Sequence, residues 1–95
     1  MTGARRKARA IALQALYELD TVGHSMEAVL SRLLDEVSLS DENQAFVREL
    51  VGGVARHGEE IDRHIRKFAP AWPVAQLSVI DRSILRLAIF EILFE

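Results

Sequence analysis

Apolar residues recur along this chain every three to four positions, which is the spacing of one face of an α-helix. Five such segments can be distinguished, and no run alternates between apolar and polar residues as a half-buried strand would. The predicted helices cover about residues 4–20, 26–37, 41–57, 59–68 and 79–94. The pattern therefore predicts an all-α bundle of about five helices.

The residues between these segments are suited to beginning or breaking helices. Ser25, Ser40 and Ser78 each precede a predicted helix, where a hydroxyl can accept a hydrogen bond from a free backbone amide. Asp81 follows Ser78 by three residues, which resembles a capping box with aspartate in place of glutamate. Residues 70–73, Pro-Ala-Trp-Pro, predict a rigid connector because proline restricts both itself and the residue before it.

Two consecutive glycines, Gly52 and Gly53, lie inside the third predicted helix. Two glycines cost a helix about 2 kcal/mol relative to two alanines. We therefore predict that another helix approaches closely at this point. Gly58, a few residues later, is predicted to end or kink the helix.

The last predicted helix is apolar on every side from Ile84 to Phe94, apart from Arg86 and Glu91. A helix of this kind belongs in the centre of a protein. The other four predicted helices could cover only one of its sides. We interpret the sequence as a C-terminally truncated domain whose last helix is covered by further chain or by another molecule.

The composition indicates one small domain covering residues 1–95. The chain is 49% hydrophobic and 27% charged, and its formal net charge is −2. It has no cysteine, which excludes disulfides and thiolate metal sites and fits a reducing cytoplasm. The sequence predicts neither a signal peptide nor a membrane span, and we expect a cytoplasmic protein.

Positive charge is concentrated at the start of the first helix, at Arg5, Arg6, Lys7 and Arg9. These are a third of the twelve basic residues of an otherwise acidic protein. Cations at a helix N-terminus oppose the macrodipole at about 0.3–1 kcal/mol each, so stability alone does not favour them. The cluster is typical of a surface that binds a polyanion, and single-stranded RNA is the leading candidate. Four phosphate contacts would give a slope of about −3 in log K against log [salt], and Gln14 is a candidate for a base contact.

Other polar and exposed positions have two interpretations each. Leu13 and Tyr17 lie off the apolar stripe of the first helix, so either another helix covers them or they form a partner surface. Arg86 and Glu91 lie on a mostly apolar helix and are expected to be ion-paired. Asp81 is nearer the helix start, where both a capping role and a partner contact are open.

The sequence gives no support for catalysis or for a cofactor. His24, His57 and His64 have no confidently placed acidic neighbour to complete a metal site. The chain has no nucleophile elbow, phosphate-binding loop or dinucleotide-binding glycine motif. We predict a non-enzymatic protein without metal or cofactor.

Four ordered motifs resemble the NusB family of transcription antitermination factors. Residues 5–17 resemble the arginine-rich opening of the family, and residues 46–54 its third-helix signature. Ile61-Asp62 follows at the expected distance, and Trp72 with residues 79–91 resembles the central helix. The resemblance covers the whole chain, with the last two family helices missing.

This resemblance implies an all-α fold of two small helical subdomains and a non-catalytic adaptor function. It implies binding of the boxA element of ribosomal RNA leaders together with NusE, a small-subunit ribosomal protein. The complex would join Nus-factor assemblies on RNA polymerase and suppress premature termination. It implies a NusE contact at Tyr17 and Asp81, and RNA contacts at Arg5, Arg6, Lys7, Arg9 and, less directly, Gln14.

Two other interpretations remain beside the free antitermination factor. A similar helical module precedes the catalytic domain of some ribosomal RNA cytosine methyltransferases, although the strongly basic start favours the free factor. The chain could also be a structural bundle that oligomerises through residues 84–94. Some NusB-like proteins are homodimers, so dimerisation is compatible with the first interpretation.

Overall fold

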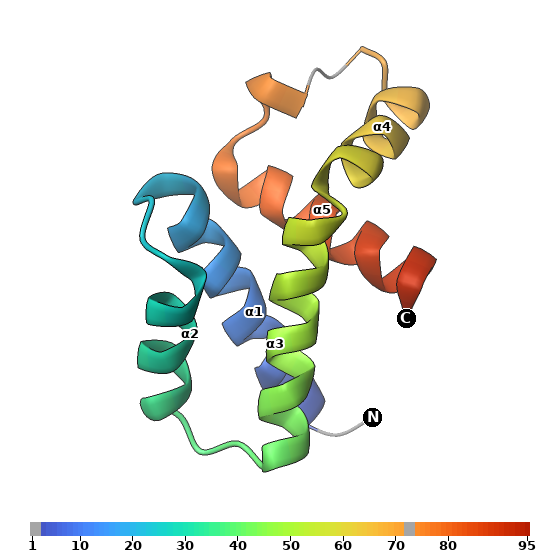
Figure 1. Ribbon diagram of the computed structural model, residues 1–95. Coiled ribbons are helices and arrows are strands. Elements are labelled where there is room, and N and C mark those ends of the chain that lie inside the picture. Colours follow the sequence, from blue (N-terminus) through green and yellow to red (C-terminus); the bar gives the residue numbers. More distant parts are fainter. Residues whose placement is uncertain (1–2, 72–73) are drawn as a thin grey trace.

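The structure is a computed structural model that describes residues 3–71 and 74–95. The described residues form five α-helices and a short 3-10 helix, without a strand, which confirms the all-α prediction. The predicted connector includes Trp72 and Pro73, which lie outside the described residues. The elements are α1 Gly3–Thr21, α2 Met26–Asp35, α3 Asp41–Arg56, α4 Gly58–Phe68, η1 Val74–Gln76 and α5 Val79–Phe94 (Figure 1).

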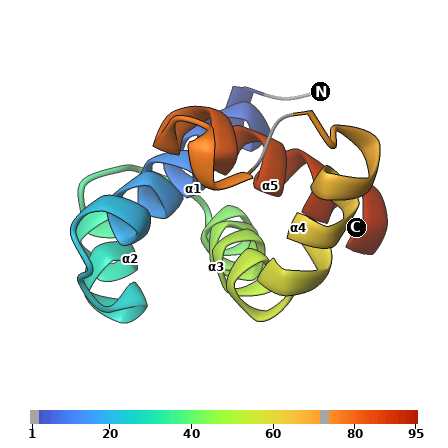
Figure 2. The same ribbon diagram turned by 90° about the horizontal axis from the view of Figure 1, so that it is seen from above.

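The helices pack around α1 and α3. α1 contacts α2, α3 and α5, and α5 also contacts α3 and α4. Figure 2 shows α2 and α4 on opposite sides of the molecule, with α3 between them and α1 and α5 along the remaining side. α1 and α5 run antiparallel, because Arg9 pairs with Glu91 near one end and Asp20 pairs with Arg82 near the other.

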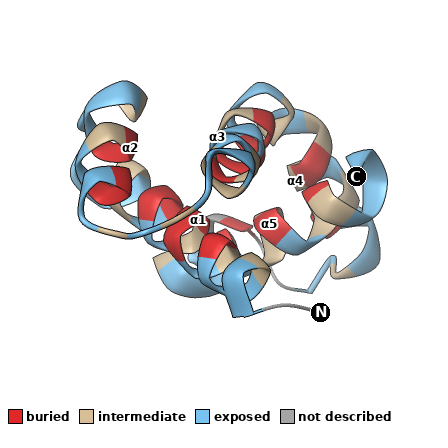
Figure 3. Ribbon diagram, turned by 90° about the horizontal axis from the view of Figure 1, so that it is seen from below, coloured by how far each residue is buried: buried red, intermediate tan, exposed pale blue. Residues whose placement is uncertain are grey.

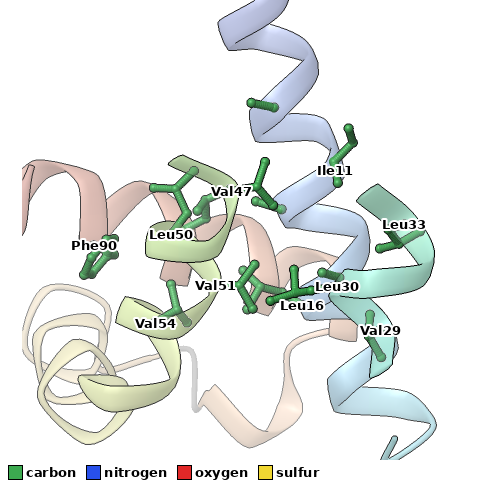
Figure 4. Packing of buried hydrophobic residues seen from close by; sticks show 14 of the residues in the cluster. Ile11, Leu16, Val29, Leu30, Leu33, Val47, Leu50, Val51, Val54 and Phe90 are labelled. Atoms are coloured by element: carbon green, nitrogen blue, oxygen red, sulfur yellow. The ribbon is translucent and has the colours of Figure 1, made fainter. Parts of the chain in front are cut away.

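The core lies where these helices face one another (Figure 3). Alanines on α1 are fully buried at positions 8, 12 and 15, and their small side chains allow the neighbouring helices to come close. Figure 4 shows the side chains of α3 in the middle of the core, between α1 and α2 on one side and Phe90 on the other. The largest fully buried side chains are Val29, Leu30, Val47, Leu50, Val51 and Ile61.

Serine caps begin three of the helices, as predicted. The hydroxyl oxygens of Ser25, Ser40 and Ser78 each accept a hydrogen bond from the backbone amide three residues on, at 3.1–3.2 Å. The break predicted at Gly58 is also confirmed, since α3 ends at Arg56 and α4 begins at Gly58. These local signals fix where each helix starts and therefore which face it turns to the core.

The two glycines of α3 have different surroundings. A Cβ atom at Gly53 would lie 2.1 Å from Cζ of Phe90, so the ring of α5 packs directly on the α3 backbone. A Cβ atom at Gly52 would meet only Nη1 of Arg56, at 3.2 Å, on the same helix. The predicted close approach of another helix is confirmed for Gly53 and is wrong for Gly52.

The outer side of α5 is uncovered in the described part of the chain. Ser83, Leu87 and Phe90 are buried, whereas Ile84 and Ile92 are exposed, Ile92 to 80%. The other helices therefore cover one side of α5 only, as its all-round apolar sequence predicted. Within the described ranges, no helix is both long enough and apolar enough to cross a membrane.

Candidate nucleic-acid interface

The start of α1 is held rigidly and presents two cations to solvent. Ala8, Ile11 and Ala12 are buried in the core, which fixes the orientation of the first turns of the helix. Arg6 and Lys7 lie away from this buried stripe and are exposed. A phosphate can therefore approach both side chains without any movement of the helix.

Arg5 is engaged with α3. Its Nη1 donates a hydrogen bond to Oδ1 of Asn43 at 3.1 Å, and its guanidinium carbon lies 3.7 Å from the ring centre of Phe46. A cation over an aromatic face at this distance is stabilised by the ring quadrupole. Arg5 is half-buried as a result, and its charge is held at the junction of α1 and α3.

Arg9 is engaged with α5. Its Nε donates to both carboxylate oxygens of Glu91, at 2.9 and 3.1 Å, and the two side chains are 36% and 22% exposed. Glu91 thus pairs with a residue of α1, a partner that the sequence did not indicate. Arg6 and Lys7 are therefore exposed, whereas Arg5 and Arg9 also hold the fold together.

Carboxylates border this cationic region on its α5 side. The pKa of Glu95 is raised, first by its hydrogen bond with Glu49 and then by partial desolvation and the charges of Glu49 and Glu91. Arg5 acts in the opposite direction and lowers the pKa of Glu95.

An exposed strip runs along α1 from these cations toward the other end of the helix. Lys7, Ala10, Gln14 and Tyr17 are all exposed, and their spacing places them on one face. Leu13 is half-buried and packs against the core beside α5, while Tyr17 is 43% exposed. The two residues therefore differ: Leu13 is partly covered by the neighbouring helices, whereas Tyr17 remains on the surface.

Tyr17 and Asp81 lie at the same end of the α1–α5 pair. Asp20, one turn after Tyr17, accepts a hydrogen bond from Arg82 at 2.7 Å, and Arg82 adjoins Asp81. Asp81 donates its backbone amide to the Ser78 cap, and its side chain is exposed. Farther along the two helices, toward the Arg9–Glu91 pair, lies an open groove of about 250 Å³, lined by Arg9, Ala10, Leu13, Ile84, Leu87, Ala88 and Glu91.

An ion-pair network joins α1, α4 and α5 on the other side of this end. Arg86 donates to both carboxylate oxygens of Asp62, at 2.8 and 2.9 Å, and its Nη1 lies 3.8 Å from Oδ2 of Asp20. Arg82 bonds the same Asp20 oxygen. The predicted pairing of Arg86 is confirmed. The network borders a cavity of about 420 Å³ whose polar lining includes Asp20, Glu59, Asp62, Ser83 and Arg86.

A sequence model of the NusB family matches residues 6–95. The chain belongs to the NusB family. It is 57% identical to the transcription antitermination protein NusB of Dehalococcoides mccartyi strain CBDB1, over all of this chain and 66% of that protein. The protein of the same name from Roseiflexus sp. strain RS-1 is 46% identical, over all of this chain and 67% of its own length.

A solved structure also has the same fold. It is described as the crystal structure of a plectonemic RNA supercoil, and one of its chains superposes with a TM-score of 0.88 at 28% identity. The superposition covers 98% of this chain and 68% of that one. The present chain thus spans about two thirds of the length of its NusB relatives, and these matches do not favour the methyltransferase interpretation.

The sequence did not indicate the residues that position Arg5 and Arg9 at the start of α1. Phe46 packs partly against the core, and one side of its ring carries Arg5. Asn43, in the first turn of α3, was not singled out. No group of three potential metal-ligating side chains occurs in the described parts of the chain.

Replacing Asp62 with alanine is expected to lower the free energy of unfolding by about 2 kcal/mol, because Arg86 would lose its bidentate partner. The value lies between those of exposed and fully buried pairs, since the two side chains are 19% and 26% exposed. Urea denaturation followed by circular dichroism measures it. Asp35→Ala, at the exposed end of α2, is the control and should change stability by less than about 0.5 kcal/mol. Equal stability of the two variants would contradict a structural role for the network.

Proposed function

We propose that this NusB-family chain is a non-catalytic adaptor that binds boxA-type single-stranded RNA together with the ribosomal protein NusE. In this role it would act in the cytoplasm within a Nus-factor complex on RNA polymerase, during synthesis of ribosomal RNA. The observation that carries the proposal is the pair of exposed cations, Arg6 and Lys7, on a rigidly packed helix start. Homodimer formation is compatible with this function.

In the proposed complex, the RNA backbone follows the exposed strip of α1. Arg6 and Lys7 bind phosphates directly, while Arg5 and Arg9 add positive charge beside them and keep the helix start in place. Gln14 lies two turns beyond Lys7 on the same face, where its amide can bond the edge of an unstacked base. Phosphate contacts supply affinity in this arrangement, and the base contact supplies sequence preference.

NusE is proposed to bind at the other end of the strip, at Tyr17 and Asp81. An exposed tyrosine is a suitable anchor, because tyrosine buries a large area at little cost in entropy. The exposed carboxylate of Asp81 can accept hydrogen bonds from a partner. The RNA and NusE would then occupy opposite ends of one helix, with their binding energies coupled through a short rigid element.

The test is a titration of boxA-type RNA, followed by fluorescence anisotropy, with and without NusE. We expect the chain to bind RNA alone and to bind it more tightly when NusE is present. In Tyr17→Ala the affinity for NusE should fall about 30-fold, and the enhancement of RNA binding by NusE should be lost. RNA affinity without NusE should not change in this variant. Val22→Ala removes another exposed apolar side chain near the end of the same helix and serves as the control. Absence of RNA binding under all conditions would contradict the proposal.

A further inference from the structure

The two proposed NusE anchors lie on helix ends that the core does not hold. Tyr17 is near the end of α1, and Asp81 is in the first turn of α5. Along α1 the last buried side chain is that of Leu16, and along α5 the first is that of Ser83. From these two residues to the helix ends, every side chain is half-buried or exposed. The spacing between the two anchors therefore depends on contacts other than core packing.

Arg82 joins the two helix ends. Its Nε and Nη2 donate to Oδ2 of Asp20 at 3.0 and 2.7 Å, and Asp20 lies one turn after Tyr17. Its Nη1 makes a longer hydrogen bond, 3.5 Å, to the backbone carbonyl oxygen of Leu77, just before α5. The side chains of Arg82 and Asp20 are 16% and 28% exposed, so salt and water screen this pair less than a surface pair. One guanidinium thus connects α1, the segment before α5 and α5 itself.

The pair places each charge at the less favourable end of its helix. The macrodipole favours anions at the start of a helix and cations at its end. Asp20 is next to the last residue of α1, and Arg82 is among the first four residues of α5. Helix stability alone would therefore not select these two residue types. Their attraction across the two helices accounts for both.

The direction of the Arg82 side chain also leaves Asp81 available to a partner. Adjacent residues on a helix do not face each other, and the Arg82 guanidinium is bonded to Asp20. Two arginines and two aspartates balance one another in the network, namely Arg82, Arg86, Asp20 and Asp62. Asp81 is outside it: its side chain is exposed and forms no salt bridge within the described residues.

We propose that Arg82 is a positioning residue for NusE binding, which acts through Asp20 to hold Tyr17 and Asp81 at the spacing that NusE recognises. This inference rests on the proposed function, since it concerns the same NusE surface. Arg82 does not contact NusE in this role. Without the pair the two helix ends would move more independently, and NusE would have to order them at a cost in affinity.

The test measures NusE affinity in a double-mutant cycle. Arg82→Gln and Asp20→Asn should each weaken NusE binding about tenfold, and the double variant should weaken it no further, because all three lack the same bond. Arg82→Lys should recover most of the affinity, since an ammonium can still bond Asp20 but cannot also reach Leu77. RNA affinity without NusE should be unchanged in the double variant, whose net charge equals that of the wild type.

Asp62→Ala is the control for stability. It breaks the α4 arm of the same network and destabilises the fold, but it leaves the Arg82–Asp20 pair in place. Its NusE affinity should equal that of the wild type at a temperature where circular dichroism shows every variant to be folded. An equal loss in this control would overturn the inference, because stability would then govern NusE binding.

Amide hydrogen exchange provides a measurement that does not require NusE. The amide of Val22 bonds the carbonyl oxygen of Glu18, and the amide of Asp81 bonds the hydroxyl of Ser78. In Arg82→Gln both amides should exchange about tenfold faster, because the two helix ends would open more often.

The remaining outcomes separate the two proposals. Wild-type affinity in Arg82→Gln would overturn the inference and leave the proposed function intact. Losses that add to about 100-fold in the double variant would do the same, since they would show that each residue contacts NusE directly. Failure of the wild type to bind NusE would overturn the proposed function. Unchanged amide exchange in Arg82→Gln would then also show that the pair does not hold the helix ends.

Discussion

Gly53→Ala is expected to lower the free energy of unfolding by about 2 kcal/mol and the melting temperature by about 10 °C. Alanine normally stabilises a helix by about 1 kcal/mol relative to glycine. Here its Cβ atom would lie 2.1 Å from Cζ and 2.3 Å from Cε1 of Phe90, far inside contact distance. Phe90 is buried and stacks between other rings, so it cannot turn away without disturbing the packing of α5. Thermal unfolding followed by circular dichroism measures the change.

Gly52→Ala is a matched control with the opposite expected sign. It lies next to Gly53 on the same helix, and its new Cβ atom would meet only the flexible end of Arg56. Stability should rise by up to about 1 kcal/mol, from helix propensity alone. The double variant Gly53→Ala with Phe90→Leu should lose less free energy of unfolding than the sum of the losses in the two single variants. The reason is that leucine at position 90 leaves room for the new Cβ atom. If Gly53→Ala were as stable as Gly52→Ala, the close approach of α5 would be wrong.

The local features of this fold were predictable because they depend on residues close together in the sequence. Ser25, Ser40 and Ser78 cap helices through amides three residues away, and the apolar spacing identifies each buried face. The glycine pair indicated a close approach because its propensity cost needed a compensating contact. The sequence could not distinguish Gly53 from Gly52, because which of the two glycines faces α5 depends on where α5 packs against α3.

The partners of the charged residues were not predictable in the same way. Arg9 and Glu91 are 82 positions apart, and Asp20 and Arg82 are 62 apart, so only the antiparallel packing of α1 and α5 brings them together. Phe46 has an apolar side chain and packs partly against the core. In the fold it also supports the guanidinium of Arg5. Charge clustering thus located the candidate RNA surface, whereas tertiary packing decides which of its cations is exposed.

This division of the four cations leads to the second expected result. Arg6→Gln with Lys7→Gln should weaken binding of boxA-type RNA about 25-fold at 100 mM salt, since two contacts change the salt slope by about 1.4. The same slope predicts a loss of only about threefold at 500 mM salt. Both side chains are exposed, so the fold should be unaffected. Anisotropy titrations over a range of salt concentrations give both the affinity and the slope.

Arg32→Gln with Arg48→Gln is the control, because it removes equal charge from exposed arginines that pair with Glu18, Glu36 and Glu27. If this control lost as much affinity, net charge would govern binding and the α1 surface would have no special role. Arg9→Gln tests whether a cation that also holds the helices together behaves differently. It should reduce both stability and RNA affinity, because it leaves the Glu91 carboxylate without its ion-pair partner beside the binding surface. Exposed cations change affinity alone, whereas cations that also hold helices together change both, and the two measurements therefore separate direct contact from positioning.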